Sequence, residues 1–384
     1  MKYLILIGDG MSGRPLTSLG SQTTLETART PNIDKLLSAG LTGLVQNVPH
    51  GLKPGSDVAN MSIFGYDPRK YYSGRAPLEA AAMGIRLGRG DVAFRCNLVT
   101  IRDGKMQDFT AGHIPTKAAR RLLKKINKKL GDARVKFYPG VSYRHLCVIK
   151  NGNLKVKCTP PHDITGRSVK KYLPPDALLQ RLMTVSQEIL APEKTKATQI
   201  WLWGQGQAPK LVSLAKKYKL RGAVITAVDL IKGLGHYAGL KPLKITGATG
   251  FLDTNYAGKA RAALRTLRRQ DIVLVHVEPP DECGHMGDSK LKIRAIEDFD
   301  RKIVGPIINA LFRQKTPFRV LILPDHPTPI CLKTHSGEPV PFVYFDSAKP
   351  RPRCPRKYSE KTARQTGLYI PHGHELLGKL YAGF

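Results

Sequence analysis

The sequence has no long apolar run. None of its hydrophobic stretches approaches the roughly 18 residues that a membrane-spanning helix needs. The opening run, MKYLILIGDGM, is too short for the apolar core of a secretory signal, and Asp9 interrupts it. We therefore expect a cytoplasmic protein without membrane contact.

Cysteine pairing motifs are also absent. The six cysteines among 384 residues form no CxxC pair and no tight cluster. Scattered cysteines in a chain of this length are typical of reduced thiols in a cytosol rather than of a disulfide framework. The length itself suggests about two to three domains.

Acidic residues are scarce: 29 Asp and Glu stand against 62 Lys and Arg, a formal net charge of +33. Such a balance raises the hypothesis of a nucleic-acid-binding protein. The densest basic run, 116–136, has its leucines and isoleucine at helical spacing, which places the charges on the opposite face, and aromatic residues are not interleaved. This is typical of a solvated surface helix. We therefore favour a basic enzyme with an anionic small-molecule substrate over a nucleic-acid partner, and predict no oligomeric state.

Short apolar runs alternate with helical patterns along much of the chain. The runs that read as buried strands are 2–8, 223–228, 271–277, 319–324 and 341–345. They lack strict alternation, which favours a parallel sheet covered on both faces. Helices are expected at 30–40, and at 290–312 with a bend near Gly305-Pro306. This order predicts an α/β fold, a mostly parallel sheet between layers of helices.

The middle of the chain has a different pattern. Residues 76–199 are patchier, and the stretch 136–158 looks like a β-hairpin that turns at the Asn-Gly-Asn of 151–153. We expect this segment to form a smaller inserted α+β domain. Residues 1–75 and 200–384 would then form the main domain.

Three of the expected strands end in acidic residues or histidines. One runs into Asp9, one into Asp281 and then His285, and one into Asp325-His326. In open α/β sheets, ligands bind beyond the carboxyl ends of the strands, so these groups are expected to meet at one edge. Carboxylates together with imidazoles suit a divalent ion such as Mn²⁺ or Zn²⁺.

A serine completes this set. Ser56 follows Pro-Gly and precedes an apolar helical run, where a serine commonly caps the helix. The other interpretation is a nucleophile beside a metal, with the helix N-terminus stabilising an attached phosphate; the candidate ligands elsewhere favour it. The candidate metal ligands are Asp9, Ser56, Asp281, His285, Asp325, His326 and His335. They are too many for one four-coordinate ion and predict a two-metal site for phosphoryl transfer.

Motifs that carry a family resemblance cover nearly the whole chain. They are LIGDGM (6–11), PGSDVANMSIFGYDPRKYYSGRAPLEAA (54–81), DVAFRCNLVTI (91–101), AGHI (111–114), FYPGVSYRHL (137–146), PPHDI (160–164), IWLWGQG (200–206), AVDLIKG (227–233), GATGFLDTNYAGKA (247–260), PPDECGHMGD (279–288), LPDHPTPI (323–330) and HSGEPVPF (335–342). Together they resemble the 2,3-bisphosphoglycerate-independent phosphoglycerate mutases of the shorter, archaeal-type branch, in the alkaline phosphatase superfamily.

The resemblance implies a fold, a reaction and a set of ligands. The fold would be an alkaline-phosphatase-like metal-binding domain with an inserted substrate-binding (phosphotransferase) domain. The reaction would interconvert 3-phosphoglycerate and 2-phosphoglycerate in glycolysis and gluconeogenesis, through a phosphoserine and without 2,3-bisphosphoglycerate. The ligands of one ion would be Asp9, Ser56, Asp325 and His326, and those of the other Asp281, His285 and His335. Mn²⁺ is the favoured ion, with Zn²⁺, Mg²⁺ and Co²⁺ open.

The resemblance also implies groups that hold the glycerate. Arginine forks suit its carboxylate, and the candidates are Arg75, Arg95 and Arg144. His113, His162 and Asp163 are the candidate polar or acid–base groups, and Arg75, His113 and Asp163 are placed with Ser56 as catalytic. Either Lys217 or Lys232 is expected at the phosphate. His50, His145 and His276 receive no role in the site. A metal-dependent phosphatase of the same superfamily is the alternative enzyme.

Overall fold

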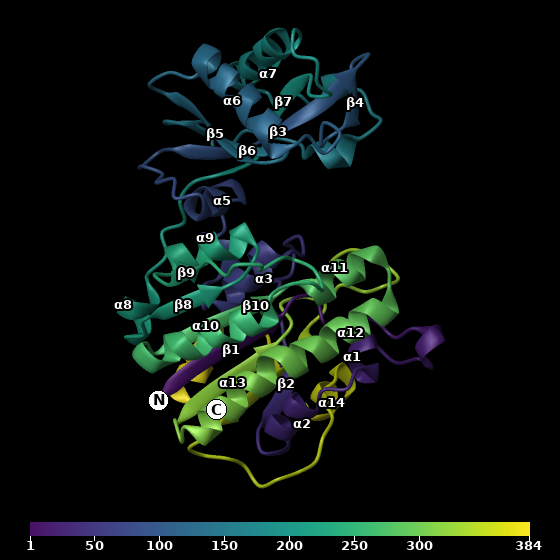
Figure 1. Cartoon of the computed structure of the whole chain (residues 1–384), viewed down its shortest axis with the longest axis vertical. Helices are drawn as coiled ribbons and strands as arrows, with labels where there is room; N and C mark the ends of the chain where they lie inside the picture. Colours follow the sequence, from purple (N-terminus) through teal and green to yellow (C-terminus); the bar gives the residue numbers. More distant parts are fainter. The chain divides into compact units, whose positions relative to one another are not determined.

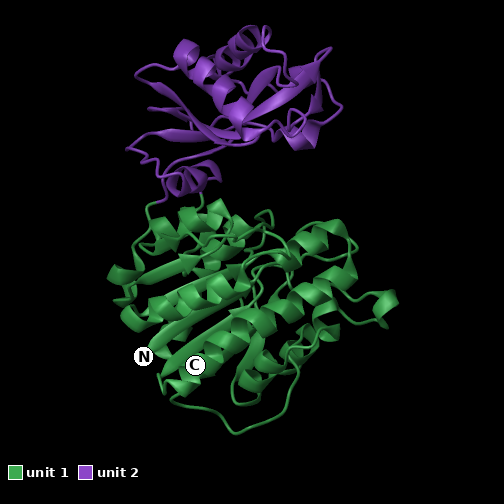
Figure 2. Ribbon diagram, in the orientation of Figure 1, with its two compact units in different colours: residues 1–72, 210–384 green, residues 73–209 purple.

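Two separate β-sheets, one in each of two units, organise the chain (Figure 2). The computed structural model describes all residues, 1–384. Unit 1 consists of Met1–Tyr72 and Lys210–Phe384, and unit 2 of Ser73–Pro209. No helix combines the length and the apolar character that crossing a membrane demands.

The sheet of unit 1 has eight strands in the order β13-β2-β12-β11-β1-β10-β8-β9. Their bounds are β1 Lys2–Gly8, β2 Leu41–Val45, β8 Gly222–Ile225, β9 Lys241–Leu243, β10 Ile272–Val277, β11 Phe318–Leu323, β12 Val340–Asp346 and β13 Tyr369–Ile370. β1 lies between β10 and β11 and is parallel to both. The mostly parallel sheet expected from the apolar runs is confirmed.

One of the five expected strands has the opposite direction. β12 is antiparallel to both β11 and β2. No helix connects β11 to β12. A parallel return needs a crossover of a dozen or more residues, which is usually helical, so this chain turns back along the neighbouring strand. The uniform burial of β12 conceals its direction in the sequence.

Helices cover both faces of this sheet (Figure 1). The helices of unit 1 are α1 Thr24–Thr27, α2 Pro31–Ser38, α3 Ser56–Ile63, α4 Pro68–Tyr71, α8 Leu214–Tyr218, α9 Asp229–Tyr237, α10 Tyr256–Arg269, α11 Pro279–Met286, α12 Ser289–Phe299, α13 Gly305–Arg313, α14 Glu360–Gln365 and α15 Leu376–Ala382. Leu4 and Leu6 of β1 share a buried cluster with Ala263 of α10 and Ile307 of α13. Ile5 points to the other face and is also fully buried. Burial on both faces explains why the strands read as continuous apolar runs.

The helix expected at 290–312 is divided rather than simply bent. A π-helical turn, Asp300–Val304, joins α12 to α13. Asp300 is fully buried and accepts hydrogen bonds from the backbone N–H groups of Asn32 and Ile33 at the start of α2. Such turns mark a local adjustment of the helix. Here the adjustment lies where the buried carboxylate satisfies two otherwise unpaired N–H groups.

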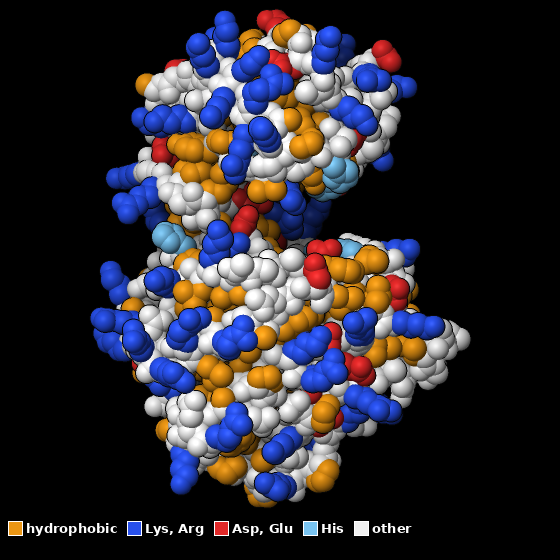
Figure 3. Space-filling view, viewed as in Figure 1, with side chains coloured by type: hydrophobic (Ala, Val, Ile, Leu, Met, Phe, Trp, Pro, Cys, Tyr) orange, Lys and Arg blue, Asp and Glu red, His pale blue; other side chains and the backbone are white.

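Unit 2 is an antiparallel sheet with helices. Its elements are α5 Ala76–Ala82, β3 Val92–Arg102, β4 Lys105–Asp108, α6 Thr116–Leu130, β5 Val135–Val141, β6 Arg144–Ile149, α7 Ala177–Leu190 and β7 Gln199–Gly206. β7 pairs with β3, so the unit continues past residue 199, where the sequence suggested its end. Leu122, Leu123 and Ile126 of α6 are buried as its spacing predicts. Lysine and arginine side chains are spread over the visible face of both units (Figure 3).

The prediction that the hairpin turns at Asn-Gly-Asn is wrong. β5 and β6 instead turn at Ser142-Tyr143, since Val141 pairs with Arg144. Ser142 adopts a left-handed conformation with φ +53°. Its backbone N–H donates to the Thr116 hydroxyl, and its own hydroxyl donates to a carbonyl of the same segment, Ile114. These tertiary contacts fix a turn that the local residues do not signal.

The buried histidine of β6 predicts an acid-sensitive unit 2. His145 is 2% exposed, its Nδ1 accepts the backbone N–H of Gly140, and its Nε2 has no partner. Burial, with a smaller effect of the Arg120 charge, lowers the pKa of His145 to about 3. Between pH values of about 6.5 and about 3, His145 is protonated in the unfolded chain but stays neutral in the folded chain. The free energy of unfolding should therefore fall by ~1.4 kcal/mol per pH unit on acidification in this range.

Urea unfolding followed by tryptophan fluorescence measures this dependence, because both tryptophans, Trp201 and Trp203, lie in β7 of unit 2. His145→Asn keeps an acceptor for the Gly140 N–H and should reduce the fall in the free energy of unfolding on acidification. The exposed His113→Asn should keep the parental slope. Parallel curves for the parent and His145→Asn would contradict the assignment.

Candidate functional site

The candidate site lies at the carboxyl ends of three adjacent strands of unit 1. Asp9 follows β1, and Asp325 with His326 follows β11. Asp281 and His285 sit one turn apart on α11, which begins just after β10. Because β1 is parallel to both neighbours, the three strand ends point the same way. This is the edge at which the sequence analysis predicted a site.

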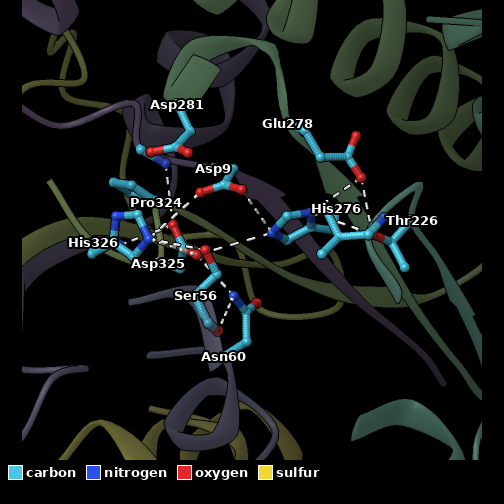
Figure 4. Close-up of polar contacts among 12 residues, drawn as sticks. Asp9, Ser56, Asn60, Thr226, His276, Glu278, Asp281, Pro324, Asp325 and His326 are labelled. Atoms are coloured by element: carbon cyan, nitrogen blue, oxygen red, sulfur yellow. Dashed lines mark hydrogen bonds and ion pairs between the residues drawn. The ribbon is translucent and has the colours of Figure 1, made fainter. Parts of the chain in front are cut away.

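One group of potential ligands, the first group, consists of Asp9, Asp325 and His326, whose ligand atoms lie within 4.8 Å of one another. His326 Nε2 is 3.7 Å from Asp9 Oδ1 and 3.5 Å from Asp325 Oδ2. Ser56, at the start of α3, places its Oγ 3.2 Å from the same nitrogen (Figure 4). Asn60, one turn further along α3, donates 2.7 Å to Asp325 Oδ2. The helix that carries the serine is therefore tied to the carboxylates.

The second group consists of Asp281, His285 and His335. His285 Nε2 is 3.2 Å from Asp281 Oδ2, and His335 Nε2 is 3.4 Å from Asp281 Oδ1. The two imidazole Nε2 atoms are 3.0 Å apart. His285 Nδ1 lies 2.9 Å from the backbone oxygen of Lys333, an arrangement that leaves Nε2 free as a ligand.

The two groups are neighbours. Thr328 donates its hydroxyl to Asp281 Oδ1 and lies 3.3 Å from His326 Nδ1. The His326 and His335 rings are 4.1 Å apart between centroids. One threonine thus orients a member of each group.

Crowding perturbs the carboxylates. Burial, followed by the charges of Asp325 and Asp281, raises the pKa of Asp9 well above its usual value. Burial acts in the same direction on Asp325, but His326 and His276 outweigh it and lower the pKa of that carboxyl. Similarly, hydrogen bonds from His285 and His335 overcome burial and hold the pKa of Asp281 well below its usual range. Strong perturbation of several buried acids at one place is typical of a functional site.

These residues fit divalent cations. Asp9 Oδ1 is buried and has no hydrogen-bond partner, although it lies beside His326 Nε2. No arginine or lysine forms an ion pair with any of the three buried carboxylates, and a cation would neutralise the negative charge that remains. Carboxylate oxygen and imidazole nitrogen are the ligands that Mn²⁺ and Zn²⁺ accept. Asp9, Asp325, His326 and Ser56 could hold one ion, and the second group another.

The three arginines expected to bind a carboxylate lie near one another within unit 2. Arg95 Nε is 3.1 Å from Glu79 Oε2, and its guanidinium lies 4.2 Å from the ring centroid of Trp203. Burial is the largest effect on Arg95 and lowers its pKa, while the charge of Glu79 raises it. The charges of Arg75 and Arg144 lower it again. Positive charge is therefore concentrated at this place, as binding of an anion requires.

The candidate acid–base groups of unit 2 are exposed. The His162 ring lies 5.2 Å from the Trp203 ring, which Arg95 also contacts, and His162 Nε2 is 3.6 Å from Asp163 Oδ1. The His113 ring lies 6.1 Å from the ring of Tyr143. His162 thus lies with Arg95 beside one tryptophan.

The two lysines considered for the phosphate make other contacts. Lys217 donates to the backbone oxygen of Gly65, and Lys232 pairs with Asp229. Two other lysines, Lys259 and Lys292, are fully buried close to the ligand groups and were not predicted from the sequence. Lys292 donates to the backbone oxygens of Ser12 and Thr328. Both lysines lie on helices rich in basic residues, so their pattern did not distinguish them.

His276, given no role from the sequence, belongs to the site. Its Nε2 lies 3.4 Å from Asp9 Oδ2 and 3.9 Å from Asp325 Oδ2. Burial alone would lower the pKa of His276, but Asp325 and Glu278 raise it to about 9. The residue stands inside an apolar strand, where a histidine is usually a core residue. The one nearby signal in the sequence was Glu278, two residues further along, which is also its neighbour in the structure.

The fold and the site together define a two-unit α/β protein with adjacent carboxylate–imidazole groups suited to divalent cations. The family model of 2,3-bisphosphoglycerate-independent phosphoglycerate mutase matches residues 38–195. Proteins of that name from Methanosarcina barkeri and Methanothrix thermoacetophila are 47% and 48% identical to this chain. The alignments cover 99% of both chains for the former and 100% for the latter. This chain therefore belongs to the 2,3-bisphosphoglycerate-independent phosphoglycerate mutases, and the resemblance found in the sequence is confirmed.

Solved structures agree with this assignment. A protein from Pyrococcus horikoshii superposes with a TM-score of 0.84 at 29% identity, covering 99% of this chain and 97% of that one. The cofactor-independent phosphoglycerate mutase from Thermoplasma acidophilum gives a TM-score of 0.69 at 25% identity, covering 100% and 99%. The α/β architecture is thus shared along the full length.

Asp9→Asn tests whether the crowded carboxylates bind a divalent cation. Saturating Mn²⁺ should stabilise the parent by about 2.7 kcal/mol at 100 times the dissociation constant, and the variant by clearly less. Calorimetric melting with and without Mn²⁺ gives both quantities.

Asp300→Asn is the matched control, since Asp300 is equally buried but contacts α2 rather than the ligand groups. Its gain on adding Mn²⁺ should equal that of the parent. An Asp9→Asn variant that gains as much from Mn²⁺ as the parent would contradict the interpretation.

Proposed function

We propose that this chain interconverts 3-phosphoglycerate and 2-phosphoglycerate by passing the phosphoryl group through Ser56 at a centre of two divalent cations, without 2,3-bisphosphoglycerate. The observation that carries the proposal is the position of Ser56 Oγ beside His326 Nε2, within reach of the first group. The reaction would take place in the cytoplasm, in glycolysis and gluconeogenesis.

The cations supply the electrophilic part of the chemistry. Mn²⁺ is favoured, with Zn²⁺, Mg²⁺ or Co²⁺ open; two such ions would neutralise the phosphoryl oxygens and lower the pKa of a nearby hydroxyl. Asp9, Asp325 and His326 would hold one ion with Ser56, and the second group the other. The protein residues then have to position the nucleophile and retain the glycerate.

Ser56 is well placed as the nucleophile. It is the first residue of α3, and its hydroxyl makes no capping bond, because Gly55 occupies the cap position. The oxygen therefore remains available to attack the phosphorus. The N-terminus of α3 presents unpaired N–H groups and a partial positive charge to the phosphate that Ser56 would carry.

The reaction consists of two displacements. Ser56 Oγ forms a bond to phosphorus while the bond between phosphorus and the C3 oxygen breaks, which gives phosphoserine and glycerate. The C2 hydroxyl of the retained glycerate then takes the phosphoryl group from Ser56 and gives 2-phosphoglycerate. His113 and Asp163 are the proposed acid–base groups that supply and accept the two protons.

The glycerate is held by groups of unit 2. We assign its carboxylate to Arg75, Arg95 and Arg144, since planar guanidinium groups bind carboxylates through paired hydrogen bonds. His162 is the proposed partner of a glycerate hydroxyl. Lys217 or Lys232 would contact the phosphate in this scheme, and the contacts of both lysines support such a role less well. A net charge of +33 favours the approach of the anionic substrate.

Ser56→Ala separates this route from its alternatives. The variant should lose at least about three orders of magnitude in isomerisation rate while binding two equivalents of Mn²⁺. The assay couples 2-phosphoglycerate to enolase in Mn²⁺-loaded protein without 2,3-bisphosphoglycerate, and measures free phosphate in parallel. Ser62→Ala is the matched control on the same helix, because Ser62 Oγ donates to the backbone oxygen of Asn47 and faces no ligand group.

Three outcomes oppose the proposal. Undiminished turnover of Ser56→Ala would exclude the phosphoserine. Release of phosphate from the parent without 2-phosphoglycerate would indicate the metal-dependent phosphatase. Binding of duplex DNA that persists at about 0.2 M salt, without either activity, would favour a nucleic-acid-binding protein.

A further inference from the structure

Three ionisable side chains form a buried line that ends at the ligand groups. His276 and Lys259 are 0% exposed, and Glu278 is 2% exposed. His276 lies near the end of β10, Glu278 is the first residue after that strand, and Lys259 lies on α10. The close-up shows His276 between Asp9 and Glu278 (Figure 4).

Glu278 is fixed by four donors. Its Oε1 accepts from the Thr226 hydroxyl at 2.9 Å and from the Ala227 N–H at 2.6 Å, and it lies 3.4 Å from His276 Nδ1. Its Oε2 accepts from Lys259 Nζ at 2.5 Å. Lys259 also donates to the backbone oxygen of His276 at 3.1 Å. The carboxylate can therefore hold the imidazole in one orientation without leaving its own charge uncompensated.

His276 in turn faces Asp9. Both ring nitrogens lie near carboxylate oxygens: Nδ1 is 3.4 Å from Glu278 Oε1, and Nε2 is 3.4 Å from Asp9 Oδ2 and 3.9 Å from Asp325 Oδ2. Nε2 makes no hydrogen bond in this geometry, and Asp9 Oδ2 is its nearest carboxylate oxygen. The other oxygen of Asp9, Oδ1, has no partner and lies on the side of His326. The two oxygens of one carboxylate thus have separate surroundings: Oδ2 faces His276, and Oδ1 faces His326 of the first group.

We propose that His276 is a positioning residue for the first cation, which holds Asp9 through Oδ2 so that Oδ1 is the ligand atom, and that Glu278 and Lys259 orient His276 for this purpose. The inference rests on the proposed two-cation centre. It assigns roles to three residues outside the seven candidate ligands, and none of the three contacts the substrate in the proposed reaction.

Stability alone does not account for the line. A buried ion pair costs desolvation that its attraction often fails to recover, and an apolar set of similar volume is frequently as stable. The apolar neighbours in β10 and α10 would suit such a set. A line of buried polar side chains that stops at a candidate metal-ligating carboxylate is the arrangement by which proteins orient ligands, and loss of such a partner usually lowers metal affinity by about 10- to 100-fold.

Calorimetric titration of metal-free protein with Mn²⁺ tests the proposal without substrate, so its result does not depend on which reaction the enzyme catalyses. His276→Leu should lose about 10- to 100-fold in affinity at one site and keep the parental affinity at the other, which the second group provides. His276→Gln retains an N–H donor near the place of Nε2 and should stay within a few-fold of the parent. The control is His145→Asn, which replaces a buried histidine of unit 2 and should leave both Mn²⁺ affinities unchanged.

A double-mutant cycle tests the line itself. Glu278→Gln should weaken the same site, and adding it to His276→Leu should cause no further loss, because the carboxylate acts only through the imidazole. A purely structural role would instead lower both affinities or the melting temperature alone. If His276→Leu does not fold, the effect of Glu278→Gln on the one site decides.

The opposing results are distinct. Unchanged affinity in His276→Leu or in Glu278→Gln would overturn the proposal. An equal loss in His276→Gln and His276→Leu would also overturn it, since that pattern requires the imidazole as a direct ligand. Parental affinities in all variants together with absent isomerisation would refute the proposed function and this inference separately.

Discussion

The crowding of three buried carboxylates at one edge of a parallel sheet is the constraint on which the site depends. Asp9, Asp281 and Asp325 are 3%, 6% and 0% exposed, and each follows a different strand. Burying several like charges together is unfavourable unless positive charge or hydrogen bonds compensate them. The histidines, Thr328 and Asn60 supply part of this compensation, and divalent cations would supply the rest. The sheet holds the three carboxylates together despite this unfavourable burial, because its packed core fixes the position at which each strand ends.

Much of the fold and of this site could be predicted from the sequence. Apolar strands that end in aspartate are a direct signal, since parallel strands bring their carboxyl ends to the same edge. Asp9, Asp281, His285, Asp325 and His326 were found this way. His335 was noted as a histidine ten residues after Asp325, and Ser56 as a serine between Pro-Gly and an apolar helical run. The direction of β12 was not predictable from its composition, because a strand buried on both faces looks the same whichever way it runs.

The residues that escaped prediction depend on tertiary contacts. His276 stands within an apolar strand, and its role follows only from Asp9 on the next strand and from Glu278. Lys259 lies among other basic residues of α10, so its full burial distinguishes it only in three dimensions. Ser142 forms the turn of its hairpin because Thr116 and Ile114 hold it, and neither is near in sequence. In each case the deciding partner is distant along the chain.

Anomalous diffraction from crystals of the Mn²⁺-loaded protein tests the central claim most directly. Two ions should appear, one within about 2.0–2.3 Å of Asp9, Asp325, His326 and Ser56, and the other at similar distances from Asp281, His285 and His335. A single ion, or ions bound elsewhere with Asp9 and Asp281 still unligated, would contradict the account.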